Sequence, residues 1–218
     1  MSDTPELLPR SIWIGVILLF GLLTIACLLT LTELQSQQKA LPIYGQIVDF
    51  TLTNQDGQLT TLADLTNHVW VADIIFTRCA GPCPRMTGQM KSLQDKLPED
   101  SPAKFVTLTT DPDYDSPAIL KRYGEHYDAD FHRWIFLTGT KSEIASLAAG
   151  SLKLGSTPIA AKDQLNPADL FIHTTIFVLV DKHARMRGIF QTGGSDVDWE
   201  STVRPKLLLD IRRLERAP

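Results

Sequence analysis

An uncharged apolar run near the N-terminus limits most strongly what this chain can fold into. Ser11 to Thr32 spans 22 residues without a charge and includes seven leucines and four isoleucines. At 1.5 Å per residue, such a helix just crosses the roughly 30 Å hydrocarbon core of a bilayer. Trp13 lies near the start of the run, where an interfacial aromatic residue is typical, and Arg10 and Glu33 bracket it. We therefore predict a single-pass transmembrane anchor over residues 11–32.

Three other interpretations of this run fit less well. A buried core helix would carry a polar stripe, but the run has only scattered threonines. A cleaved signal peptide has a shorter apolar core followed by a small-residue cleavage site, and residues 33–37 offer none. Lipidation of Cys27 would call for a leucine three residues earlier, where Thr24 stands.

The overall composition is that of an ordinary globular chain. The 218 residues are 44% hydrophobic and 21% charged, with a formal net charge of −4. Proteins that bind nucleic acid carry a basic face or stripe, and no run of lysines and arginines stands out here. We therefore expect no nucleic-acid partner.

Hydrophobic periodicity divides the rest of the chain. Residues 1–10 form a short tail, residues 33–46 a Gln-rich polar tether, and residues 47–218 one folded domain.

Within that domain, the patterns predict strands at 47–53, 58–61, 69–76, 105–109, 134–137, 174–181 and 185–190, helices at 86–97, 118–127, 141–149 and 207–214, and an insertion or long loop at 150–170. Alternating strands and helices indicate an α/β fold. The tight turn before the last strand makes the central sheet mixed.

Two cysteines lie between a predicted buried strand and a predicted helix, as Cys79-Ala80-Gly81-Pro82-Cys83-Pro84. A helix N-terminus stabilises anions, so we expect a thiol there to lose its proton more readily. Zinc ribbons need further cysteines, and the predicted domain has none. Two thiolates are soft ligands that favour Cu(I). A structural disulfide or two buried cysteines that merely fill space remain the alternatives.

Of the five histidines, His173 has the sequence position that best fits a metal ligand. His68, His126, His132 and His183 fall in predicted loops or on a polar helix, where surface residues are typical. His173 stands immediately before the strand predicted at 174–181, and ligands of α/β folds gather at strand ends. It is a candidate metal ligand, although its position alone does not decide between that role and a structural one.

Several motifs together resemble the Sco/SenC family. They are the run from Val48 to Gln58, the Cys-x-x-x-Cys-Pro motif, Thr109-Thr110-Asp111-Pro112 with Asp115-Ser116-Pro117, and His173 to Asp181. The resemblance covers roughly residues 42–216. It implies a membrane-tethered, thioredoxin-like copper protein with Cys79, Cys83 and His173 as ligands.

The resemblance also implies a function and partners. Members of the family help to assemble the dinuclear copper centre of cytochrome c oxidase. The expected partners are the copper-bearing subunit of that oxidase, another copper chaperone as donor, and the membrane. The chain would then be a copper chaperone rather than a turnover enzyme. We expect its domain on the outer side, periplasmic or intermembrane-space-like, a direction that Arg10 favours only faintly.

One departure from the family concerns the oxidation state of the metal. The family often has an aspartate directly before the histidine, and here that position is Ile172. A carboxylate there could assist Cu(II), so this departure puts the affinity for Cu(II) in question. Copper is expected as Cu(I), with Cu(II) as a second form, and the working oxidation state stays open.

The alternative function is that of a thiol–disulfide oxidoreductase acting on the cysteines of a partner copper protein. Cys79 would attack and Cys83 would resolve the mixed disulfide. The Gly81-Pro82 pair resembles that of thioredoxins, but they have a cis-proline where this chain has His173-Thr174. A peroxiredoxin is excluded because Ala72 and Phe76 occupy the places of its motif proline and threonine.

The predicted anchor has a direct test. The full chain should stay in the membrane fraction through high-salt and carbonate washes, because its apolar run lies in the bilayer. Deletion of residues 1–40 should release a soluble, folded domain. Recovery of the intact full chain in the soluble fraction would contradict the predicted anchor.

Overall fold

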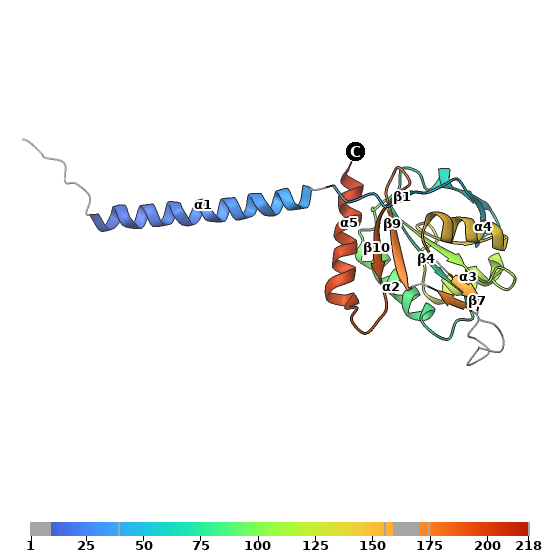
Figure 1. Ribbon diagram of the computed structural model, residues 1–218. Helices are drawn as coiled ribbons and strands as arrows, with labels where there is room; N and C mark the ends of the chain where they lie inside the picture. Colours follow the sequence, from blue (N-terminus) through green and yellow to red (C-terminus); the bar gives the residue numbers. More distant parts are fainter. Residues whose placement is uncertain (1–9, 39, 155, 159–170, 174, 218) are drawn as a thin grey trace, which may run out of the picture. The chain divides into compact units, whose positions relative to one another are not determined.

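The computed structural model describes residues 10–38, 40–154, 156–158, 171–173 and 175–217 (Figure 1). The chain divides into two compact units, Met1–Ala40 and Leu41–Pro218.

The first unit contains one long helix, α1 (Arg10–Gln38). Its Trp13–Thr30 stretch is long and apolar enough to cross a membrane, and the side chains of that stretch are exposed. A buried core helix, one of the alternatives considered from the sequence, does not fit this exposure. The helix continues beyond residue 32 into the predicted tether, since glutamate, leucine and glutamine are good helix formers.

The second unit is an α/β domain around a mixed sheet of eight strands (Figure 1), which confirms the predicted fold class. The strand order is β1-β10-β9-β4-β5-β6-β2-β3, and only the β4–β5 and β5–β6 pairs are parallel among the described strands. Strands β7 and β8 form a separate antiparallel pair. The strands are β1 (Gly45–Gln46), β2 (Thr51–Asn54), β3 (Leu59–Thr61), β4 (Trp70–Ile75), β5 (Lys104–Thr109), β6 (Trp134–Thr138), β7 (Ser156–Pro158), β8 (Phe171–His173), β9 (Ile176–Val180) and β10 (Arg185–Gln191).

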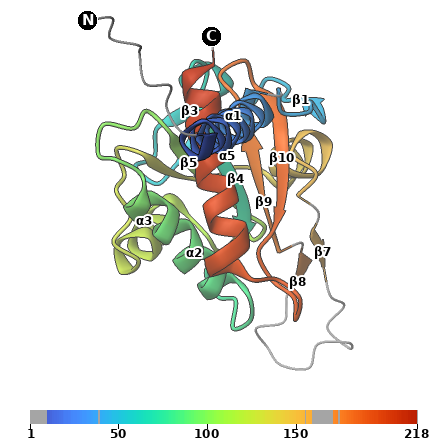
Figure 2. The ribbon, with the colours of Figure 1, turned by 90° about the vertical axis from the view of Figure 1, so that its left-hand side faces the viewer.

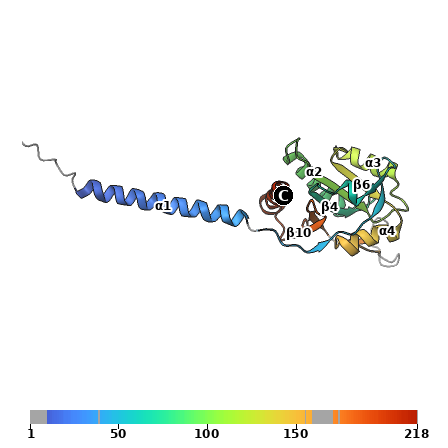
Figure 3. The same cartoon turned by 90° about the horizontal axis from the view of Figure 1, so that it is seen from above.

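Helices cover both faces of this sheet (Figures 2 and 3). One core contains side chains of α2, α3 and α5, and the opposite core contains those of α4 and the helical turns η1 and η2. The helices are α2 (Cys83–Lys96), α3 (Pro117–His126), α4 (Lys141–Ala145) and α5 (Arg204–Arg216), with turns η1 (Leu62–Asp64), η2 (Ser146–Ser151) and η4 (Trp199–Val203).

Strand β4 lies in the middle of the sheet and is buried along its whole length. Its side chains alternate between the two cores: Trp70 and Ala72 enter one and Val71 enters the other. It pairs in parallel with β5 and antiparallel with β9. The predicted central strand, buried on both faces, is therefore confirmed.

The first predicted strand, at 47–53, is wrong in its N-terminal half. Gly45–Gln46 pairs with β10 near one edge of the sheet, whereas Thr51–Asn54 pairs with β3 and β6 near the other edge. Residues 47–50 must cross between these two positions, so they do not join a strand ladder. Their alternating pattern nevertheless reflects real burial, since Ile47 is buried and Val48 is exposed.

A buried ion pair fastens the start of this unit to the β9–β10 hairpin. The Arg187 guanidinium donates to Asp181 Oδ2 at 2.5 Å, to the Leu41 carbonyl at 2.5 Å and to the Pro42 carbonyl at 3.1 Å. Burial raises the pKa of Asp181, but hydrogen bonds from Arg187, Arg185 and the His183 backbone outweigh it and lower that pKa below its usual value. The carboxylate is therefore held ionised inside the domain.

This pair generates a stability prediction. Arg187→Met should destabilise residues 41–218 by about 3–5 kcal/mol at pH 7, because the Asp181 carboxylate is left buried and uncompensated. Urea unfolding followed by the fluorescence of the buried tryptophans would measure the loss. Arg185→Gln is the matched control, since it removes a half-exposed partner of the same carboxylate and should cost about 1 kcal/mol or less.

The same pair predicts how stability depends on pH. A lowered pKa of Asp181 in the folded state gives stability that is fully present above the ordinary carboxyl pKa of about 4 and is lost as pH falls towards the folded-state pKa. The difference between wild type and Arg187→Met should shrink over that acid range. A difference that stays constant would contradict the assignment.

Candidate metal centre

The two predicted cysteine ligands lie on the loop that connects β4 to α2. β4 ends at Ile75 and α2 begins at Cys83, with Pro82 as its N-cap residue. The helix begins three residues earlier than predicted, because Pro84 fits a first turn that needs no N–H donor there. A hydrogen bond from the Cys79 N–H to the Phe76 carbonyl, at 3.1 Å, closes a turn before the first cysteine.

The cysteines differ in burial. Cys83 is fully buried and packs with Ile75 and Phe76, while Cys79 packs against this cluster and is half-buried. Both are thiols, and a hydrogen bond joins their side chains. Cys83 therefore lies in the interior, and Cys79 is partly exposed.

Their environment corrects one expectation from the sequence. A helix N-terminus favours thiolates, yet the hydrogen bond with the Cys79 thiol, together with burial, raises the pKa of Cys83 far above its usual value. Position on the helix is outweighed because Cys83 is hydrogen-bonded to its neighbour and lies away from water. Cys83 is therefore held in its thiol form.

The third predicted ligand, His173, is the last residue of strand β8. It was predicted to stand directly before a strand at 174–181; instead, β8 pairs with β7 in the register Ser156↔His173, and β9 begins at Ile176. The side chain of His173 lies outside the described residues. Within the described part of the chain, there is no group of three or more metal-binding side chains.

Hydrogen bonds connect helix α2 to the segment that follows His173. The backbone N–H and the hydroxyl of Thr192 both donate to the Thr175 carbonyl, at 2.8 and 2.9 Å. The side chain of Gln89, on α2, donates to the Thr192 carbonyl at 3.0 Å. The helix that begins with Cys83 is therefore tied to the backbone two residues beyond His173.

A glycine keeps this junction closely packed. A Cβ atom at Gly193 would lie 2.1 Å from a terminal nitrogen of Arg85 and 3.2 Å from the Thr175 hydroxyl. Arg85, two residues after Cys83, therefore lies directly against this turn.

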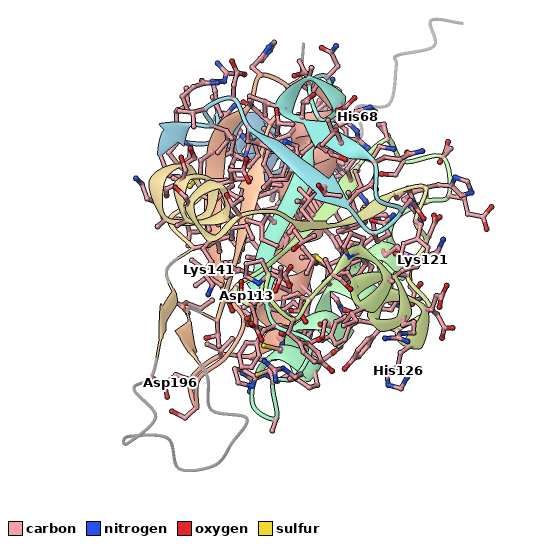
Figure 4. The ribbon with its side chains drawn as sticks, turned by 90° about the vertical axis from the view of Figure 1, so that its right-hand side faces the viewer. His68, Asp113, Lys121, His126, Lys141 and Asp196 are labelled. Atoms are coloured by element: carbon pink, nitrogen blue, oxygen red, sulfur yellow. The ribbon has the colours of Figure 1, made fainter. Side chains whose placement is uncertain are left out.

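The four other histidines were expected at the surface, and three of them are exposed. His126, His132 and His183 are exposed, and His68 is half-buried with its Nδ1 2.9 Å from the Pro102 carbonyl. Figure 4 shows His68 and His126 at separate places on the periphery of the domain.

A polar cluster beneath the cysteine loop was not predicted. Asp115 is fully buried, and its carboxylate accepts hydrogen bonds from the Thr77 N–H at 3.1 Å, from the Thr77 hydroxyl and from the Thr109 hydroxyl at 2.5 Å. Burial raises the pKa of Asp115, although these hydrogen bonds oppose the rise. The sequence signal was the Asp111-Pro112 and Asp115-Ser116-Pro117 motif, which carried the resemblance but had no assigned role.

A second contact holds the same loop from outside. Arg78, directly before Cys79, pairs with Asp111 at 2.6 Å, and its guanidinium lies 3.9 Å from the centre of the Tyr114 ring. The segment 111–115 therefore contacts the two residues directly before Cys79, Thr77 and Arg78.

Helix α3 supports the other end of the cysteine loop. The Tyr123 hydroxyl lies 2.8 Å from the Thr87 hydroxyl, which in turn donates to the Cys83 carbonyl at 3.0 Å. Burial raises the pKa of Tyr123, so it remains a neutral phenol.

Comparison with known proteins gives one consistent family. A family model described as SCO1/SenC matches residues 26–205. The SCO1 protein homolog of Bacillus subtilis (strain 168) is 38% identical over 146 residues, which are 66% of this chain and 72% of that protein.

Solved structures agree with this family. That of BsSco, described as a member of the Sco family of cytochrome c oxidase assembly proteins with a disulfide switch, is 30% identical, has a TM-score of 0.67, and is matched over 83% of this chain and 100% of that chain. Bradyrhizobium japonicum ScoI with copper bound is 20% identical and has a TM-score of 0.64 over 78% of this chain and 99% of that chain, which shows a shared fold. The predicted thioredoxin-like fold is confirmed.

The difference in burial predicts a difference in reactivity. In a reduced Cys27→Ser variant, Cys79 should react with iodoacetamide at least about tenfold faster than Cys83, because thiolate character and access decide the rate. Peptide mass spectrometry at increasing reaction times would measure both rates. Equal rates would show that Cys83 is not shielded as the structure has it.

Proposed function

This chain belongs to the SCO1/SenC family, and we propose on that basis that it binds copper and serves the assembly of cytochrome c oxidase. The observation that carries the proposal is the hydrogen-bonded pair of thiols at the end of β4, one buried and one accessible. BsSco is described as belonging to a family of oxidase assembly proteins, and the ScoI structure holds copper. A chaperone needs a site of this kind, since copper must both enter it and leave it.

We propose Cys79, Cys83 and His173 as the copper ligands. Two sulfurs within hydrogen-bonding distance of each other are close enough to bind one ion, and two thiolates with one imidazole are a soft donor set that suits Cu(I). Ile172 offers no carboxylate beside the histidine, which also favours Cu(I) over Cu(II).

The burial of the thiols assigns them different tasks. Cys79 is accessible and is the first to meet a copper ion carried by a donor protein. Cys83 then completes the sulfur pair from inside and gives up its proton to do so, since a thiol binds metal as thiolate. Because the hydrogen bond with Cys79 and burial raise the pKa of Cys83, copper binding releases a proton near neutral pH.

We propose that helix α1 anchors the protein and that the domain faces the outer side of the membrane. The copper-bearing subunit of the oxidase would receive the metal there, and another copper chaperone would supply it. The length and composition of Trp13–Thr30 support the anchor. In this role the chain is a carrier rather than a turnover enzyme.

A thiol–disulfide oxidoreductase is the second candidate. Two observations favour it: the thiols are already in contact, and BsSco is described as having a disulfide switch. Here Cys79 would attack a partner disulfide and Cys83 would release the product, so that the partner's cysteines are reduced and this pair is oxidised.

Replacement of His173 distinguishes the two candidates. His173→Ala should lower Cu(I) affinity by about tenfold or more and impair oxidase assembly, because a ligand is lost, while the dithiol can still be oxidised and reduced. Competition titration with a Cu(I) chelator and a disulfide-reduction assay are the two measurements.

His126→Ala is the matched control, since it removes an exposed histidine away from the cysteines. If His173→Ala keeps the copper affinity of the control, His173 is not a ligand, and the thiol–disulfide oxidoreductase becomes the better-supported function.

A further inference from the structure

We propose that Asp115 is a positioning residue for Cys79, and that it acts through Thr77. Two of the three hydrogen bonds that its carboxylate accepts come from this one residue, through its backbone N–H and its hydroxyl. Thr77 lies two residues before Cys79 on the loop that carries both thiols. The inference rests on the proposed function only in taking Cys79 and Cys83 as the working pair.

The loop needs such a support because regular structure holds only its ends. β4 fixes it at Ile75, and α2 fixes it at Cys83. Between these points the backbone of Cys79 is held by its bond to the Phe76 carbonyl. The Thr77–Asp115 contact joins this part of the loop to a different segment of the domain, 38 residues further along the chain.

The segment 111–115, which carries Asp115, is itself held in place by hydrogen bonds. The segment 111–115 folds on its own backbone, with the Asp115 N–H donating to the Asp111 carbonyl at 2.8 Å and the Tyr114 N–H donating to the same carbonyl at 3.1 Å. The Thr109 hydroxyl fixes it to the end of β5 by accepting from the Asp111 N–H at 2.9 Å and donating to Asp115. A buried carboxylate with three donors is confined to one position, so the atoms bonded to it are confined as well.

The three acids of this segment have separate tasks. Asp111 pairs with Arg78 on the outside of the loop, Asp113 pairs with Lys141 in solvent, and Asp115 points inward to Thr77. Figure 4 shows Asp113 beside Lys141 at the surface. Of the three, only Asp115 is fully buried, so its removal is not compensated by water.

The Thr77–Asp115 contact should raise the effective concentration of one cysteine sulfur at the other. A loop fixed at Thr77 keeps the Cys79 sulfur next to that of Cys83, and a loosened loop lets the sulfurs separate. Formation of a disulfide and chelation of one metal ion by both sulfurs each depend on that proximity. The contact should therefore favour both reactions by a similar factor.

The test is the thiol–disulfide equilibrium of the full chain, in detergent and with Cys27→Ser. Oxidation by glutathione disulfide converts the two thiols to one disulfide and yields two glutathione thiols, so atoms and electrons balance. Thr77→Val, which removes the hydroxyl, and Asp115→Asn, which removes the charge, should each lower the equilibrium constant about tenfold, or about 30 mV for this two-electron couple. Thr77→Ser keeps the hydroxyl and should stay within about twofold of wild type.

Two controls separate positioning from general destabilisation. Asp113→Asn makes the same chemical change in the same segment at an exposed ion pair. Thr109→Val removes a donor to the same carboxylate that lies on β5 rather than on the loop, and it also removes the acceptor of the Asp111 N–H. Asp113→Asn should leave the equilibrium constant within about twofold of wild type. Thr109→Val loosens Asp115 but keeps both contacts of Thr77, so it should lower the constant clearly less than Thr77→Val does, even where thermal unfolding shows that Thr109→Val is the less stable of the two.

The proposal is overturned if Thr77→Val leaves the equilibrium constant within twofold of wild type, or if Thr109→Val shifts it as far as Thr77→Val does. If Asp115→Asn does not fold, the two Thr77 variants decide. A parallel Cu(I) titration should show the same tenfold ratio between Thr77→Val and Thr77→Ser. Absence of Cu(I) binding in wild type would defeat the proposed function, while the glutathione measurement would still decide the role of Asp115.

Discussion

The complete burial of strand β4 is the constraint on which the rest of the domain depends. Its alternating side chains enter both hydrophobic cores, and its backbone pairs with β5 on one side and β9 on the other. Because β4 and β5 are parallel, their C-terminal ends lie at the same end of the sheet. The cysteine loop follows β4 and the segment 111–115 follows β5 at this end, so the sheet itself brings the two together.

Buried carboxylates fix the loops that the sheet leaves open. Asp181 binds Arg187 and holds the entry of the chain at Leu41 and Pro42, while Asp115 binds Thr77 beneath the cysteine loop. Each buried charge is costly unless hydrogen bonds satisfy it. The donors to Asp181 belong to its own hairpin, and Arg187 in turn binds the carbonyls of Leu41 and Pro42, whereas Asp115 accepts two of its bonds from Thr77, 38 residues away. The cost of burial is thus offset by contacts that determine where a loop can lie.

The thiol pair shows why position along a helix does not fix reactivity. Cys83 begins α2, where the helix favours an anion, but its hydrogen bond with Cys79 and its burial keep it protonated. Cys79 is only half-buried and is open to an exchanging partner. A pair with one shielded and one accessible sulfur suits reversible transfer, whether of a metal ion or of a disulfide.

The sequence by itself determined the elements and the kinds of chemistry, because both are local. The uncharged apolar run identified the long helix α1, the apolar pattern identified strand β4, the tight turn before the last strand identified a mixed sheet, and the Cys-x-x-x-Cys-Pro motif identified the thiols. The tertiary structure decided what depends on contacts between distant residues. It separated Gly45–Gln46 from Thr51–Asn54, reversed the expected pKa shift of Cys83, and brought Asp115 under Thr77. No pattern along the chain carries this information, since pairing across a sheet and the burial of a charge are set only when remote segments meet.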